Sequence, residues 1–197
     1  MDVDRDLHWI GHASFYIDNE DMHMFIDPFD IRAEKVPKAD LILITHAHFD
    51  HCSKKDIEKV IKPDTEIITA PGCLDDAAYK HVTIAKPGFS KSIIGIDVDA
   101  IPAYNNIDGR LSFHPRSNDW VGYIVTIGGK KLYHAGDTDY IEEMNSLKGI
   151  HAAMLPIGGK YTMDVDESIM AAKAIGAEIT IPMHYKHLLG ERGSGSG

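Results

Sequence analysis

The chain has 197 residues, of which 44% are hydrophobic, and its formal net charge is -10 at pH 7. This length suffices for one sizeable hydrophobic core but not for two ordinary domains, so we expect a single domain over residues 1–192. The negative charge, without a cluster of lysine and arginine residues, excludes a basic surface for nucleic acid.

Membrane and secretory signals are absent from the sequence. No segment reaches the roughly 18 consecutive apolar residues of a membrane-spanning helix, and the N-terminus alternates charges. We therefore expect a cytoplasmic protein with no membrane partner. Two cysteines, Cys52 and Cys73, are too few for a disulfide framework, which suits a reducing compartment. Residues 193–197 read Gly-Ser-Gly-Ser-Gly and are interpreted as a flexible linker tail.

Short apolar segments separated by turns predict strands through much of the chain. Residues 41–45 are apolar on both faces, so they predict a central strand covered from above and below. Ser53 then suits the N-cap of a helix over 54–62, which Pro63 ends. Further strands are expected at 7–10, 14–17, 22–26, 66–70, 81–84, 93–100, 122–127 and 131–134.

The C-terminal part begins with a polar segment, 104–120, that has neither helical nor strand periodicity. It predicts a loop that covers or borders a site. Helices near 140–147 and 166–175, the second ended by Gly176, then alternate with strands at 152–155 and 179–182. This order indicates two sheets packed together with helices outside.

Four potential metal ligands leave the central strand together, in the segment His-Ala-His-Phe-Asp-His at 46–51. A regular strand or helix would not bring all four to one point, whereas a loop curled around ions can. Imidazole and carboxylate ligands suit zinc, manganese or iron better than calcium or magnesium. The sequence therefore predicts a metal site built from His46, His48, Asp50 and His51.

This pattern resembles the signature of the metallo-β-lactamase fold superfamily. Three further segments resemble the family in the same order: the aspartate turn at 26–28, Tyr-His-Ala-Gly-Asp-Thr at 133–138, and Ile-Pro-Met-His-Tyr at 181–185. With Gly-His-Ala-Ser at 11–14, they are most similar to the compact branch of metal-dependent hydrolases related to ascorbate-6-phosphate lactonase. The resemblance covers residues 7–187 and implies an α/β (α+β) fold, the four-layer αββα sandwich.

Carried over residue by residue, the resemblance implies two divalent metal ions. Zinc is the first choice, with Mn²⁺ and Fe²⁺ as alternatives. Asp137 and His184 also directly follow predicted strands, where open sheets place their sites. The assignments are His46 and His48 to one metal, Asp50, His51 and His184 to the other, and Asp137 as the bridge.

One metal-binding histidine of the family lacks an equivalent at its expected strand end, where this chain reads Ile-Pro-Ala-Tyr-Asn at 101–105. His114, further along the polar loop, is the nearest candidate for the missing ligand. The alternatives are that Tyr104 or water takes its place, or that the first metal is weakly bound or absent.

The ligand set predicts a hydrolase of small molecules. A hydroxide that bridges the metals would attack an ester, a lactone or a phosphodiester. Asp50 would take its proton, and His12, His114 or Tyr185 would protonate the leaving group. Asp27 is interpreted as a hydrogen-bonding support of the metal loop.

The sequence also bears on the charge of the substrate and on other functions found in the superfamily. Arg110 and Arg116, in the polar loop, favour an anionic substrate. A secreted β-lactamase would carry a signal peptide, a nuclease would carry a basic face, and oxygen-reducing di-iron members carry an acidic residue where His48 stands. A metal-binding regulatory or binding protein with a degenerate site remains the alternative. The substrate, the metal and the oligomeric state, including a homo-oligomer, stay open.

Overall fold

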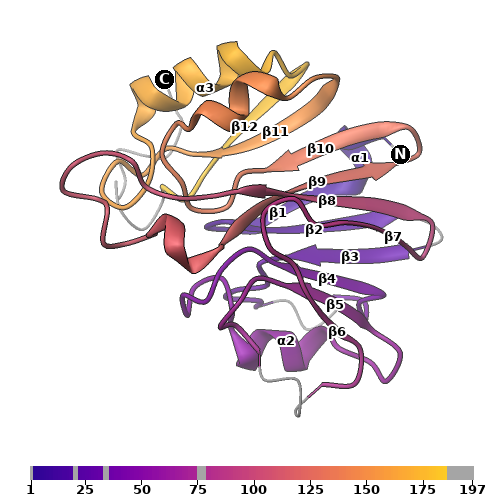
Figure 1. The fold of residues 1–197 in the computed structure, drawn as a ribbon. Coiled ribbons are helices and arrows are strands. Elements are labelled where there is room, and N and C mark those ends of the chain that lie inside the picture. Colours follow the sequence, from indigo (N-terminus) through magenta and orange to yellow (C-terminus); the bar gives the residue numbers. More distant parts are fainter. Residues whose placement is uncertain (1, 20–21, 33–35, 75–78, 186–197) are drawn as a thin grey trace. The chain divides into compact units, whose positions relative to one another are not determined.

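The computed structural model of the protein describes residues 2–19, 22–32, 36–74 and 79–185. The chain divides into an N-terminal unit, Met1–Ala85, and a C-terminal unit, Lys86–Gly197. Each unit contains one six-stranded sheet (Figure 1). The predicted linker tail at 193–197 lies outside the described residues, and the single domain over 1–192 stays a prediction.

The sheet of the N-terminal unit has the strand order β1-β2-β3-β4-β5-β6. The first three strands are antiparallel, and β3 to β6 run parallel. The strands are β1 (Leu7–Gly11), β2 (Ser14–Asn19), β3 (Met22–Ile26), β4 (Leu41–Ile44), β5 (Glu66–Thr69) and β6 (Val82–Ile84), and the helices are α1 (Val3–Asp6) and α2 (Lys54–Val60).

Strand β4 is the covered central strand that the sequence predicts. All four of its residues are fully buried, and both of its neighbours are parallel to it. Helix α2 begins after Ser53, whose Oγ accepts a hydrogen bond from the backbone N–H of Asp56. The predicted extension to residue 62 is wrong, because Ile61 already has extended backbone angles.

The sheet of the C-terminal unit has the strand order β12-β11-β10-β9-β8-β7. Strands β7 to β10 are antiparallel, whereas β10, β11 and β12 are parallel. Its elements are β7 (Ser90–Ile93), β8 (Ile96–Pro102), β9 (Val121–Ile127), β10 (Lys130–His134), β11 (Ile150–Pro156), β12 (Ile179–Met183), α3 (Val165–Ile175) and the 3₁₀ helices η1 (Arg116–Asn118) and η2 (Glu142–Ser146).

Two predictions fail in this unit. The expected strand 93–100 is a hairpin of β7 and β8, since Ile94 and Gly95 turn the chain with φ of 43° and 81°. The expected helix 140–147 is the shorter 3₁₀ helix η2. Helix α3 is confirmed, with a capping box between Asp164 and Glu167 and a left-handed C-cap at Gly176.

The parallel strands of this unit direct two candidate ligands to one edge of the sheet. Strands β10 and β12 both pair with β11 in parallel, so their carboxyl ends lie at the same edge. Asp137 follows β10 and His184 follows β12. Among the described residues, no helix is long and apolar enough to span a membrane.

Candidate metal centre

The metal loop, residues 46–51, turns sharply where β4 ends. The backbone nitrogens of His51 and Cys52 both donate to the carbonyl of His48, over 3.0 and 2.8 Å. The thiol of Cys52 donates to the carbonyl of Cys73 over 3.3 Å, which agrees with a packed thiol. The turn thus gathers the side chains that an extended strand would separate.

Asp27 supports this loop through hydrogen bonds, as the sequence predicts. Its carboxylate is fully buried and accepts three hydrogen bonds: from the backbone N–H and the hydroxyl of Thr45, over 2.7 and 2.6 Å, and from Nδ1 of His51, over 2.7 Å. Because Nδ1 of His51 carries the hydrogen, Nε2 carries the lone pair that a metal requires.

Asp27 also orients His46, through the hydroxyl of Thr45. The hydroxyl of Thr45 gives its hydrogen to Asp27, so it accepts one from Nδ1 of His46, 3.0 Å away. Nε2 of His46 then faces Nδ1 of His48 at 3.1 Å. A tetrahedral zinc ion with Zn–N distances of 2.0–2.1 Å separates two ligand nitrogens by about 3.3 Å, so the pair fits such an ion.

His12 and Asp50 form a second group with His51. One ligand atom of each lies within 4.8 Å of the others, and Nε2 of His12 lies 3.1 Å from Oδ2 of Asp50. His12 is buried, whereas Asp50 is partly exposed. His12 therefore lies close enough to Asp50 to exchange a proton with it, in agreement with its expected catalytic role.

In the C-terminal unit, Asp137 is the centre of the candidate ligands. Its Oδ2 lies 3.0 Å from Nε2 of His184 and 3.3 Å from Nε2 of His114, and all three side chains are buried. The long polar loop thus brings His114 to the carboxylate that the sequence assigns as the bridge. The ligand roles of these residues stay predictions.

Tyr104, the alternative to His114, is engaged elsewhere. Its hydroxyl donates to Glu143 over 3.0 Å, and the guanidinium of Arg116 lies 4.7 Å above its ring. Burial, followed by the hydrogen bond to Glu143, raises the pKa of Tyr104. Burial and the contact with Glu143 disfavour the phenolate that a metal would bind, so the alternative is not supported.

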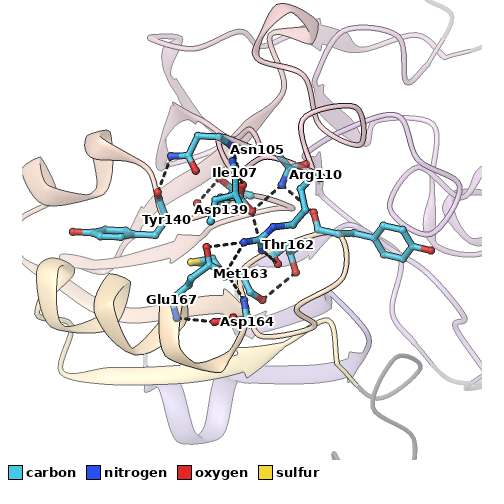
Figure 2. Close-up of polar contacts among 12 residues, drawn as sticks. Asn105, Ile107, Arg110, Asp139, Tyr140, Thr162, Met163, Asp164 and Glu167 are labelled. Atoms are coloured by element: carbon cyan, nitrogen blue, oxygen red, sulfur yellow. Dashed lines mark hydrogen bonds and ion pairs between the residues drawn. The ribbon is translucent and has the colours of Figure 1, made fainter.

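The expected substrate-binding role of Arg110 is wrong. Its guanidinium pairs with Asp139 at 3.1 Å and with Glu167 at 2.7 Å, and it also donates to the carbonyl of Thr162 (Figure 2). Its charge is therefore already neutralised by two carboxylates. Arg116 is exposed and pairs with Glu143.

Asn105 and Asp139 also belong to this group, although the sequence does not single them out. Asn105 donates to Asp139 (Figure 2) and also contacts His114. Asp139 is fully buried. One signal was available: Asn105 stands in the segment where the family has its histidine. Tyr185 directly follows His184 and is half-buried, and its catalytic role stays a prediction.

Three residues of the candidate metal centre have a strained backbone. His12, Asp27 and His184 have φ of 54°, 48° and 58°, in the left-handed region that non-glycine residues rarely adopt. Such conformations cost about 1–3 kcal/mol each and cluster at functional sites.

Comparison with known proteins identifies the family of the chain. The family described as "Beta-lactamase superfamily domain" matches residues 6–184. A UPF0173 metal-dependent hydrolase of Thermoplasma acidophilum is 36% identical over 192 residues, which are 90% of this chain and 81% of the relative.

Two solved structures share the fold. A candidate metal-dependent hydrolase from Parabacteroides distasonis is 36% identical, with a TM-score of 0.84 over 95% of this chain and 89% of that one. A metallo hydrolase from Ignicoccus hospitalis is 26% identical, with a TM-score of 0.74 over 91% and 82%. They confirm the mixed α/β fold with two sheets, and the chain belongs to the metallo-β-lactamase superfamily.

Proposed function

We propose that this protein is a metal-dependent hydrolase of a small-molecule ester, lactone or phosphodiester. The observation that carries the proposal is the fixed tautomer of the buried histidines. His46 and His51 each bind a protein acceptor through Nδ1, so each keeps the lone pair of Nε2 for a metal. The relatives named as metal-dependent hydrolases support the same activity.

The proposed centre holds two divalent ions, with zinc as the first choice. The spacing of the donor atoms within each unit supports it, and so does the family match across residues 6–184. The proposed ligands are His46, His48 and His114 for the first ion, Asp50, His51 and His184 for the second, and Asp137 as the bridge.

Such ions supply Lewis acidity and make hydroxide available near neutral pH. Residues of the chain would then carry the proton that the attacking water loses. Asp50 takes it at Oδ2, and Nε2 of His12, 3.1 Å away, receives it and returns it to the leaving group. Tyr185, beside His184, is a second candidate donor to the leaving group.

The surroundings of the metal loop bear on the substrate. Arg110 is neutralised by Asp139 and Glu167. The positive charge that attracts an anionic substrate would therefore come from the metal ions. Phe49 is 78% exposed within the metal loop, and its ring lies 6.1 Å from that of Phe29. These rings offer an apolar contact to a substrate held at the metals.

The test combines metal analysis with turnover. Freshly purified protein is analysed for metal by mass spectrometry and is assayed on a panel of esters, lactones and phosphodiesters, before and after chelation and after return of zinc or manganese. We expect two equivalents per chain and activity that follows the metal. Asp137→Ala should abolish both, whereas His151→Ala, which removes a contact to Glu178 on another part of the unit, should abolish neither. Full metal content without turnover across the panel would favour a binding protein.

A further inference from the structure

Asn105, in the polar loop, holds the imidazole of His114. Its Oδ1 lies 2.9 Å from Nδ1 of His114 and 3.0 Å from the backbone nitrogen of the same residue. On its other side, Nδ2 lies 3.0 Å from Oδ1 of Asp139 and 3.0 Å from the carbonyl oxygen of Tyr161. The side chain of Asn105 is buried, and Figure 2 shows it beside Asp139.

These partners determine which way the amide of Asn105 points. A backbone N–H can only donate, so the atom that faces the backbone of His114 must be the amide oxygen. A carbonyl can only accept, so the atom that faces Tyr161 must be the amide nitrogen. The orientation follows from the hydrogen-bond partners alone.

We infer that Asn105 is a positioning residue that fixes His114 in the tautomer with the hydrogen on Nδ1. An amide oxygen cannot donate, so the ring nitrogen 2.9 Å from it must carry the hydrogen. Nε2 of His114 then carries the lone pair and faces Oδ2 of Asp137 at 3.3 Å. The use of this lone pair as a metal ligand rests on the proposed function, whereas the tautomer does not.

Asn105 is needed because Asp137 favours the opposite tautomer. A carboxylate 3.3 Å from Nε2 attracts a hydrogen to that nitrogen, where the hydrogen would block a metal. The amide oxygen of Asn105 competes by accepting from Nδ1. The two contacts thus decide which nitrogen of His114 is available.

A charged cluster holds Asn105 in place. Oδ2 of Asp139 accepts from the backbone nitrogens of Asn106 and Ile107 over 2.8 and 3.0 Å, and Arg110 pairs with Oδ1. Arg110 is anchored in turn by both carboxylate oxygens of Glu167, in the first turn of α3 (Figure 2). The orientation of the amide is therefore built into the fold of the C-terminal unit.

The experiment reads the tautomer and the metal separately. Long-range ¹H–¹⁵N spectra of metal-free protein, with ¹⁵N-labelled histidine and at a pH about two units above the ordinary histidine pKa of about 6.5, report which nitrogen of His114 is protonated. Zinc affinity is measured by competition with a chromophoric chelator. The variants are Asn105→Ala and, as the matched control, Asn106→Ala, whose amide nitrogen donates to the carbonyl of Tyr140 at the surface.

We expect Nδ1–H in the parent and in Asn106→Ala, and a shift to Nε2–H in Asn105→Ala. Zinc affinity should fall about 10- to 100-fold in Asn105→Ala and remain unchanged in Asn106→Ala. Nε2–H in the parent, or equal affinities in the two variants, would overturn the inference. The parent spectrum decides the tautomer even if Asn105→Ala fails to fold. A parent with Nδ1–H that binds no zinc would contradict the proposed function and leave the tautomer confirmed.

Discussion

Oδ2 of Asp27 holds Nδ1 of His51 at 2.7 Å, and both side chains are fully buried. A second carboxylate–imidazole pair, Asp18 and His23, lies at the surface of the same unit at 3.2 Å. Of these two pairs, only the buried one includes a residue of the metal loop, His51. Its Asp27 also binds Thr45, directly before the loop. The two pairs have the same chemistry but differ in burial, so they provide a matched comparison.

Asp27→Asn should weaken metal binding about 10- to 100-fold. The new amide group donates where the carboxylate accepted, so Nδ1 of His51 must become the acceptor and its hydrogen moves to Nε2, where it blocks the metal. Asp18→Asn should leave the affinity unchanged. Chelator competition measures both, and equal affinities would show that the anchor does not set the tautomer of His51.

His12→Gln should lower kcat about 10²- to 10⁴-fold while the metal content stays at the parent level. The variant removes the imidazole 3.1 Å from Asp50 that we propose as the proton carrier. His8→Gln is the control, because His8 of β1 stacks instead on Tyr16 of β2, with ring centroids 5.4 Å apart. If His12→Gln instead loses a metal equivalent, His12 is a ligand rather than an acid.

Arg110→Ala should lower the free energy of unfolding by about 3–5 kcal/mol. It leaves the carboxylates of Asp139 and Glu167 without their shared cation in a buried setting. Arg116→Ala, which removes an exposed pair with Glu143, should cost less than about 1 kcal/mol. Urea unfolding of the metal-free proteins tests the difference, and similar losses would mean that the buried cluster adds little.

The stability of the N-terminal unit should fall in acid through Asp56. Burial raises the pKa of Asp56, but hydrogen bonds from Lys59, Ser53 and the backbone of Asp30 outweigh it and hold the pKa below 3.8. A folded-state pKa below the unfolded value stabilises the protein above about pH 4, and this stabilisation disappears as the pH falls through the folded-state value.

Asp56→Asn should therefore destabilise the protein more at about pH 7 than at about pH 3. Urea midpoints at both pH values provide the comparison. Asp64→Asn is the control, since this exposed carboxylate lies 3.9 Å from Lys62. A loss that is equal at both pH values would assign the effect of Asp56→Asn to packing rather than to charge.

The sequence by itself predicted the strands around β4, the helix α3 and the metal loop, because each depends on local pattern. Alternating or continuous apolar residues identify strands, and Gly176 marks the end of α3. Failures came where a local signal was weak: Ile94 and Gly95 turn the chain inside an apolar run, and η2 forms only a 3₁₀ helix.

Only the tertiary structure decided how the histidines are used. Asp27, far away in the chain, sets the nitrogen that carries the hydrogen in His51 directly and in His46 through the hydroxyl of Thr45. In His114 this choice depends on Asn105, in an irregular loop. Arg110 could be taken for a substrate-binding residue until the structure placed it between Asp139 and Glu167. Hydrogen bonds and ion pairs act across space, so a linear pattern identifies the residues for a metal centre but not the atoms that they present.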